Sequence, residues 1–179
     1  MMRVINSQAI FSHCRLYRYA LWRTWNTEQP TVMFIGLNPS TADEVEDDQT
    51  IRRCMRFARG WGYGGLVMTN LFALRATNPK DMLAHPAPVG PKNDEYLQQL
   101  GDSVAARVAC WGAWGGHRGR DNEVIRMLGA LQCLGLTQAG QPRHPSRLLA
   151  TTQPRPFERR DVDALRDGDG ILTGGGSNL

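Results

Sequence analysis

Two asparagines and one histidine are the polar residues of this sequence whose types and placement best suit chemistry. Asn38 follows an apolar run over residues 31–36, Asn70 ends a second run over residues 66–70, and His144 precedes a proline in a polar loop. A carboxamide carries both a donor and an acceptor, so each asparagine can bind an amide-like edge through two hydrogen bonds. The proline that follows His144 holds this histidine in an extended geometry. The three side chains indicate a polar ligand site if folding brings them together.

The two apolar runs are expected to be neighbouring parallel strands. Both are short and favour a strand by composition, and residues 51–61 between them place apolar side chains at helical spacing. Strand, amphipathic helix and strand make a parallel crossover unit, so Asn38 and Asn70 would emerge at the same sheet edge, where open α/β sheets bind ligands. His144 would meet them there. Two alternatives are an ordinary turn after the first strand and a structural hydrogen bond between the two asparagines.

The whole pattern predicts an α/β fold, a three-layer sandwich around a central, mainly parallel four-stranded sheet. One domain is expected over residues 1–150, and residues 151–179 are expected to be a C-terminal extension that is partly disordered. The domain begins with an extended segment, residues 9–25, whose mixed arginines and aromatics suit an edge hairpin or contact with a nucleic-acid strand. Further helices are predicted at 93–104 and 121–134, and further strands at 107–111 and 136–138.

Composition sets the class of protein. The chain has 179 residues, of which 41% are hydrophobic, so one domain with a real core is expected. The N-terminus lacks a secretion signal and no apolar run is long enough to span a bilayer, which favours a cytoplasmic protein without membrane contact. The four cysteines are scattered without metal-binding spacing, which indicates buried, reduced thiols and no zinc or iron–sulfur site. A net charge of +4 and a pI near 9.1 permit nucleic-acid binding without demanding it.

Two charged loops lie beside the predicted helices. Residues 41–50 are strongly acidic, and Asp47 and Asp48 stand where the following helix favours negative charge, so capping is expected rather than metal binding. Residues 112–120 are rich in glycine and positive charge. Their backbone amides, with Arg118 or Arg120, could approach a phosphate, although the loop matches no known phosphate-binding fingerprint.

Three short motifs carry a resemblance to a known superfamily. Gly36-Leu37-Asn38-Pro39-Ser40 resembles the first motif of the uracil-DNA glycosylase superfamily, in the Gly-x-Asn-Pro form of its mismatch-specific branch. Met68-Thr69-Asn70-Leu71-Phe72 resembles the strand whose asparagine reads the uracil edge, and His144-Pro145-Ser146 resembles the second catalytic motif. The three motifs follow one another in the order found in that superfamily.

A second resemblance covers more of the chain. An uncharacterised bacterial and phage family, domain-of-unknown-function family 1643, is similar in five segments. These are Asn38-Pro39-Ser40-Thr41-Ala42-Asp43, Asp47-Asp48, Thr50-Ile51-Arg52-Arg53-Cys54, Asn70-Leu71-Phe72-Ala73 and Gly90-Pro91-x-Asn93. This similarity is specific, but it brings no established activity.

The glycosylase resemblance implies an N-glycosidase that removes uracil or a modified pyrimidine by hydrolysis. It implies that His144 donates to the base carbonyl, Asn38 positions a water, and Asn70 reads the pyrimidine edge. Gly36, Leu37 and Phe72 would complete the base pocket. The residues expected to contact phosphate or DNA are Ser40, Arg118, Arg120, Ser146 and Arg147.

The same resemblance implies no cofactor and no metal. The expected partner is single- or double-stranded DNA or a nucleotide, and the protein is expected to act as a monomer. The acidic residues Asp43, Asp47 and Asp48 would repel phosphate, which points toward a free nucleoside, a nucleotide or a modified base instead of duplex DNA. The alternative function is a nucleic-acid- or nucleotide-binding protein that keeps the pocket without turnover.

Overall fold

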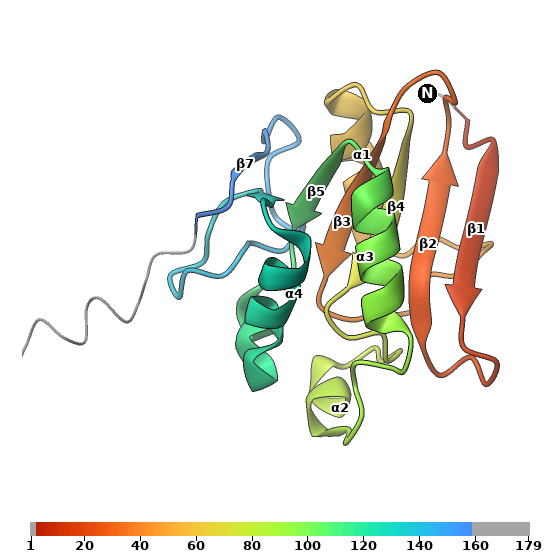
Figure 1. Ribbon diagram of the computed structural model, residues 1–179. Helices are drawn as coiled ribbons and strands as arrows, with labels where there is room; N and C mark the ends of the chain where they lie inside the picture. The colour runs from red at the N-terminus through yellow and green to blue at the C-terminus, as the bar shows by residue number, and fades with distance from the viewer. Residues whose placement is uncertain (1–2, 159–179) are drawn as a thin grey trace, which may run out of the picture.

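A seven-stranded mixed sheet runs through the centre of the computed structural model, which describes residues 3–158 (Figure 1). The spatial order is β1-β2-β4-β3-β5-β6-β7, and the pairs β4–β3, β3–β5 and β5–β6 are parallel. The prediction of a four-stranded sheet is therefore wrong in number, because antiparallel strands extend the parallel part on both sides. The bounds are Asn6–Phe11 (β1), Arg18–Thr24 (β2), Thr31–Gly36 (β3), Gly65–Asn70 (β4), Ala106–Ala109 (β5), Gln132–Cys133 (β6) and Arg155–Pro156 (β7).

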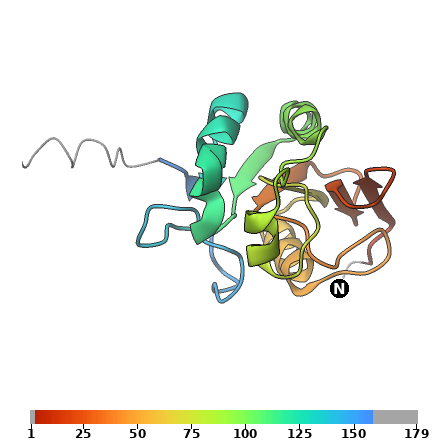
Figure 2. The same cartoon turned by 90° about the horizontal axis from the view of Figure 1, so that it is seen from below.

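Helices cover both faces of this sheet. Helix α1 lies behind the sheet in Figure 1, whereas α3 and α4 lie in front of it, and the view from below in Figure 2 shows the three layers. The short helix α2 and the 3-10 helix η1 belong to the connections after β4 and β5. The bounds are Gln49–Gly60 (α1), Pro79–Ala84 (α2), Asn93–Ser103 (α3), Ala113–Gly119 (η1) and Arg120–Leu128 (α4).

Strand β3 forms the middle of the core because its side chains are buried on both faces. Successive side chains of a strand point to opposite faces. Val32 and Phe34 accordingly pack in the cluster that contains the apolar side of α1, and Met33 and Ile35 pack in the cluster that contains residues of α3 and α4. This two-sided burial explains why residues 31–36 read as one continuous apolar run. The predicted strand–helix–strand unit is confirmed by the parallel pairing of β3 with β4.

The chain after α4 departs from the prediction. The apolar periodicity favoured a helix over residues 121–134, but α4 ends at Leu128 because Gly129 adopts φ 70°, a conformation that favours glycine. Leu131 then packs in the core, and Gln132–Cys133 forms β6 beside β5. The fourth strand was expected at 136–138, where the structure has only an isolated bridge between Leu136 and Pro142.

Both ends of the described chain join the sheet. Strands β1 and β2 form an antiparallel hairpin that pairs with β4, so the edge-hairpin interpretation of residues 9–25 is confirmed. Strand β7 pairs with β6 and lies beyond the expected domain boundary at residue 150. The rest of the expected extension, residues 159–179, lies outside the described residues.

Two further observations concern the described chain. All four cysteines are free thiols, and three of them are buried as expected, whereas Cys14 is exposed. No helix within residues 3–158 is both long and apolar enough to cross a bilayer.

Candidate functional site

A polar pocket of about 470 Å³ opens at the carboxyl ends of β3 and β4, beside the first turn of α1. The strands contribute Gly36 and Asn70, the loop after β3 contributes Asn38, and the loop after β6 contributes His144. The predicted convergence of the two asparagines and the histidine is thus observed. The pocket is also lined by Arg18, Leu37, Ser40, Asp48, Thr50, Trp111 and Trp114.

Asn70 is the most unusual polar group of the pocket. Its side chain is 1% exposed, and neither Oδ1 nor Nδ2 has a hydrogen-bond partner among the described residues. A buried carboxamide without partners costs about 1–3 kcal/mol for each group left unsatisfied, so native proteins rarely keep one without a reason. The structural hydrogen bond between the two asparagine side chains is excluded, because the Asn70 side chain makes no hydrogen bond within residues 3–158. Its free donor and acceptor are available to a ligand.

The surrounding chain holds Asn70 in place. Asn93 Nδ2 donates to the backbone carbonyls of Asn70 and Leu71, each at 3.0 Å, and Arg120 Nε donates to Leu71 at 2.9 Å. A Cβ added to Gly36 would lie 2.8 Å from Asn70 Oδ1, so glycine at this position leaves room for the carboxamide. Asn93 is the first residue of α3, so its side chain connects this helix to the end of β4.

Asn38 is oriented by its own donors. Its Nδ2 donates to the Pro39 carbonyl at 3.0 Å and to the Ala76 carbonyl at 2.8 Å. These two bonds use both hydrogens of the amide, so the group that Asn38 can offer a ligand is the acceptor Oδ1. This geometry suits a residue that holds a water molecule.

His144 is held as a neutral donor. The Ser146 backbone N–H donates to His144 Nδ1 at 3.2 Å, and Ser146 Oγ lies 2.8 Å from the same nitrogen. Because Nδ1 accepts, the neutral ring carries its proton on Nε2, which lies 3.5 Å from Thr50 Oγ1. Burial lowers the pKa of His144, and the nearby charge of Asp48 opposes this shift. Ser146, expected to contact phosphate, therefore sets the orientation of the imidazole.

Two charged residues of the pocket were not identified from the sequence. Arg18 is 2% exposed, its Nη1 donates to the Ala42 carbonyl at 2.5 Å, and its Nε is buried without a partner among the described residues. Burial lowers the pKa of Arg18 to about 10, so the guanidinium stays positive at neutral pH. Asp48, which also lines the pocket, caps α1 by accepting from the Ile51 N–H at 2.9 Å. The pocket therefore holds one buried cation and one carboxylate whose charges favour each other.

The aromatic residues at the pocket are Trp111 and Trp114, and not the predicted Phe72. Phe72 is fully buried in the core, where its ring lies 5.8 Å from that of His117, and it does not line the pocket. The Phe72 N–H donates to the Leu37 carbonyl at 2.9 Å, which turns the chain after β4 inward. Trp114 of η1 does line the pocket and is 54% exposed. A tryptophan within the glycine-rich loop that follows a predicted strand was the sequence signal that could have identified it.

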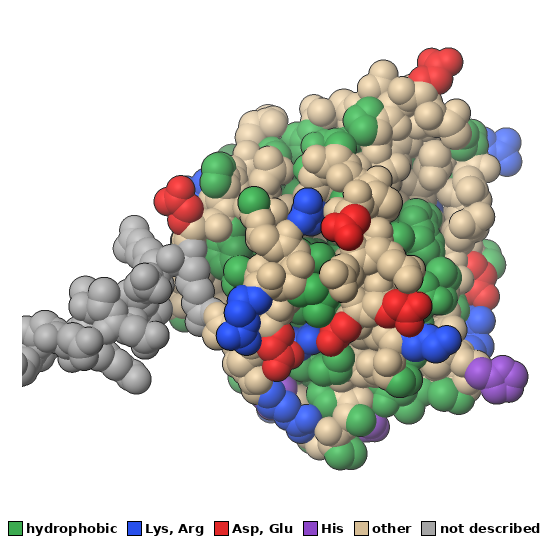
Figure 3. All heavy atoms as spheres, viewed as in Figure 1, with side chains coloured by type: hydrophobic (Ala, Val, Ile, Leu, Met, Phe, Trp, Pro, Cys, Tyr) green, Lys and Arg blue, Asp and Glu red, His purple; other side chains and the backbone are tan. Residues whose placement is uncertain are grey.

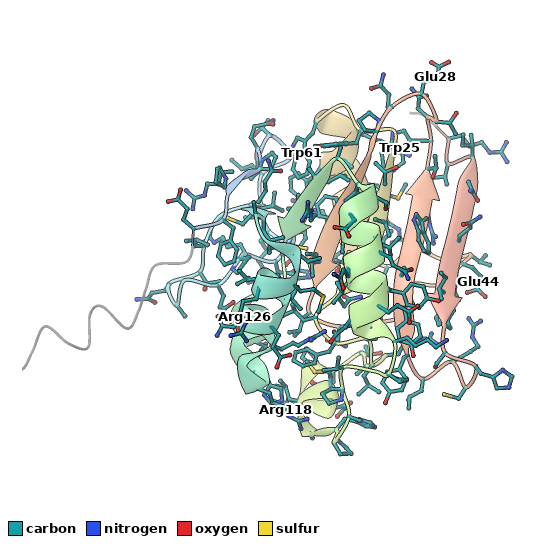
Figure 4. The ribbon with its side chains drawn as sticks, viewed as in Figure 1. Trp25, Glu28, Glu44, Trp61, Arg118 and Arg126 are labelled. Carbon is teal, nitrogen blue, oxygen red and sulfur yellow. The ribbon has the colours of Figure 1, made fainter. Side chains whose placement is uncertain are left out.

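Two carboxylates of the acidic loop are paired with arginines of the first hairpin. Arg23, 1% exposed, donates to Asp47 at 2.8 Å and to the Asp43 carbonyl at 2.6 Å. Arg15 pairs with Glu44 at 3.0 Å, and Figure 4 shows Glu44 near the end of β1. Of the two aspartates expected to cap the helix, only Asp48 does so.

No group of three or more potential metal-ligating side chains occurs within residues 3–158.

The remaining predicted contacts lie outside the pocket. Arg118, labelled in Figure 4, donates to the His85 and Pro86 carbonyls at 3.0 Å each. Arg120 is 3% exposed and forms ion pairs with Asp94 and Glu123. Arg147 is exposed with φ 64°, and it is absent from the residues that line the pocket.

The structure is a mixed α/β domain with a pocket at the carboxyl ends of its parallel strands, which is the place where open α/β sheets usually bind ligands. The family described as "Protein of unknown function (DUF1643)" matches residues 18–146, and the chain belongs to this family. The match includes the strands, the acidic loop and the histidine that build the pocket. Neither a curated protein nor a solved structure matched the chain.

Proposed function

We propose that this protein is a uracil-DNA glycosylase-like N-glycosidase that removes uracil or a modified pyrimidine from nucleic acid. The observation that carries this proposal is the Asn70 carboxamide, which is buried in the pocket with its donor and its acceptor both unused. The neighbouring Asn38 and His144 are the partners that the motif resemblance implies. A pocket of about 470 Å³ is within the usual size of small-ligand sites, about 300–1,000 Å³.

A pyrimidine edge matches the free groups of Asn70. Uracil presents an N–H donor next to a carbonyl acceptor, so it can donate to Oδ1 and accept from Nδ2 of the same carboxamide. The ring of Trp114 can stack on the base, since base–aromatic stacking contributes about 1–3 kcal/mol. These contacts offset the few kcal/mol that it costs to extrude a nucleotide from a helix.

The charges of the pocket suit cleavage of an N-glycosidic bond. The bond between sugar C1′ and the base nitrogen breaks, its electron pair goes to the base, and the sugar becomes oxocarbenium-like. His144 Nε2–H donates to the base oxygen where negative charge builds, and the Arg18 cation stabilises the same charge. The Asp48 carboxylate stabilises the positive sugar. A water held by Asn38 Oδ1 attacks C1′, and its proton passes to the departing base, which leaves an abasic sugar.

The arrangement of the acidic loop supports a nucleic-acid substrate. Its carboxylates Glu44 and Asp47 are paired with Arg15 and Arg23, and the Asp43 carboxylate accepts from backbone N–H groups of its own turn. Charges that are paired in this way repel a phosphate less than the sequence suggests.

The test is cleavage of labelled oligonucleotides that carry uracil, mismatched thymine or modified pyrimidines, followed by alkali to break abasic sites. We expect product with the wild-type protein and a loss of about 10²–10³ in rate for His144→Ala, since one donor to the developing anion is removed. Asn38→Ala should also lose product. His13→Ala, at an exposed position outside the pocket, is the control.

The alternative is a nucleic-acid- or nucleotide-binding protein without turnover. The buried Asn70 carboxamide also favours it, because its donor and acceptor can recognise a base without any bond being cleaved. Oligonucleotides that bind with salt-sensitive affinity, remain uncleaved and lose affinity in Asn70→Ala would support the binder. A protein that neither binds nor cleaves any oligonucleotide would contradict both functions on DNA and leave free nucleotides as the ligand class.

A further inference from the structure

A second cavity of about 810 Å³ lies along the outer side of α1, and five arginines line it: Arg3, Arg52, Arg53, Arg56 and Arg59. We call it the arginine groove. Positions 52, 56 and 59 follow the spacing that places side chains on one face of a helix, and 52 and 56 are about 6 Å apart along the axis. The groove is therefore an elongated cationic surface.

The arginines of the groove divide into two kinds. Arg53 donates to the Leu148 carbonyl and lies over the Phe57 ring, and Arg59 lies over the Trp25 ring at 4.6 Å. These side chains form walls of the groove. Arg52 and Arg56 are exposed, and neither has an ion pair or a side-chain hydrogen bond within residues 3–158. Their charges are available to a ligand.

The carboxylate in the groove does not cancel this charge. Asp47 lines it, but its Oδ1 accepts at 2.8 Å from Nε of Arg23, a buried residue of β2 that does not line the groove. The opposite face of the molecule differs: Figure 3 shows blue and red side chains interspersed over α3 and α4. Within the described chain, the α1 face thus carries a groove in which five arginines outnumber a single carboxylate.

The groove and the polar pocket meet at the start of α1. Asp47 and Gln49 line the groove, whereas Asp48 and Thr50 line the pocket. Alternate residues of the same turn thus face two neighbouring cavities. A ligand with a chain of negative charges can follow the groove and place one unit in the pocket.

We propose that the arginine groove binds the phosphates of a nucleic-acid strand whose target base occupies the pocket. This inference rests on the proposed function and deepens it, because it selects a polynucleotide over a free nucleotide as the substrate. A single phosphate would need one of these arginines, whereas the groove extends them along the helix. Arginines that neutralise phosphates make binding depend on salt.

The experiment measures the binding of a fluorescein-labelled single-stranded oligodeoxynucleotide by anisotropy, between about 50 and about 200 mM salt. The variant Arg52→Gln/Arg56→Gln is compared with Arg126→Gln/Arg155→Gln, which removes the same charge from exposed positions on α4 and β7. We expect the first variant to bind more weakly and to lower the slope of log affinity against log salt by about 1.4, since each phosphate contact contributes about 0.7. The control variant should keep the wild-type slope. Circular dichroism confirms that both variants fold.

Equal slopes in the two double variants would overturn the groove proposal. It would also be overturned if Arg52→Gln/Arg56→Gln abolished binding to vesicles of anionic lipid while oligonucleotide binding stayed unchanged. Cleavage is not part of this measurement. Salt-dependent binding through Arg52 and Arg56 without any cleavage would support the groove proposal and contradict the proposed enzyme activity. Cleavage by the wild-type protein, with the same salt slope in Arg52→Gln/Arg56→Gln as in the wild type, would support the enzyme activity and contradict the groove proposal.

Discussion

The carboxamide of Asn70 sets the chemistry of the pocket at the scale of single residues. Polar groups at 1% exposure are normally satisfied, and Thr69, its neighbour in β4, follows this rule by donating to the Phe34 carbonyl at 3.1 Å. Asn70 breaks it, although Asn93 and Gly36 hold it in place. A rigid, unsatisfied amide is preorganised for a ligand and lowers the stability of the free protein.

Replacing Asn70 by leucine should therefore stabilise the protein and abolish base binding. An apolar side chain of similar shape removes the cost of the unsatisfied groups, so the free energy of unfolding in urea should rise by about 1–3 kcal/mol. Thr69→Val is the matched control. It removes the hydrogen bond that Thr69 Oγ1 donates to the Phe34 carbonyl and should lower the free energy of unfolding. If both variants were equally destabilised, Asn70 would be a structural residue.

His144 should make stability depend on pH. Burial lowers its pKa in the folded protein below the ordinary value, so the unfolded chain takes up the proton more readily as the solution becomes acidic. The contribution of His144 to the free energy of unfolding is fully present above its pKa in the unfolded chain, about 6.5. This contribution is lost as the pH falls through the lower pKa of the folded protein. Urea unfolding between about pH 7 and about pH 5 should show a weaker pH dependence in His144→Asn. If His144→Asn kept the pH dependence of the wild type, the lowered pKa of His144 would be contradicted. His13→Asn is the control, because it also removes a histidine but from an exposed position.

At the scale of elements, the first hairpin and α1 build the pocket between them. Arg18 and Arg23 point from β2 to the loop that precedes α1, where both donate to backbone carbonyls. Buried arginines are costly unless their donors are used. These contacts explain why a strongly acidic loop lies against the sheet in a basic protein. The loop ends at Asp48, which caps the helix and lines the pocket.

The two roles of Asp48 can be separated by two substitutions. Asp48→Ala removes the acceptor of the Ile51 N–H and should cost about 0.5–2 kcal/mol in the free energy of unfolding. Asp48→Asn keeps an acceptor and should stay within a few tenths of a kcal/mol of the wild type. Both remove the carboxylate, so both should lower the rate of base release. Thermal unfolding and the cleavage assay measure the two effects, and normal cleavage by Asp48→Asn would show that its charge is not needed.

At the scale of the whole molecule, segments far apart in sequence close the sheet around its core. Strand β7 pairs with β6, and Phe157 packs edge-on against Trp111 with ring centres 5.9 Å apart. Trp111 lines the pocket and donates to Gln141 at 2.7 Å. The end of the described chain thus supports the pocket wall from behind.

Phe157→Ala should destabilise the protein, although residue 157 lies beyond the boundary expected from the sequence. Loss of the aromatic contact and of partly buried apolar surface should lower the free energy of unfolding by about 1–2 kcal/mol, measured in urea. Leu149→Ala, at a position 77% exposed, should change it by less than about 0.5 kcal/mol. Equal effects of the two substitutions would show that the Phe157 contact contributes nothing.

Much of this architecture follows from local patterns in the sequence. The apolar run 31–36 and the helical spacing after Asp48 determined β3 and α1, and the parallel crossover required Asn38 and Asn70 to share one edge. Strands β6 and β7 could not be predicted in this way. Each is two residues long, too short for a periodic pattern, and each forms only because a partner strand is present.

The sequence by itself therefore determined β3, β4 and α1, and the polar residues at the ends of these two strands. Only the tertiary structure decided which groups of these residues are free to bind a ligand. It left the Asn70 side chain without a hydrogen-bond partner among the described residues, turned Phe72 into the core, and brought Arg18 to the pocket. Periodicity is local, because it reflects which face of one element is buried. Whether a buried donor or acceptor is satisfied depends on residues far away in the chain, which only the folded molecule brings within hydrogen-bond distance.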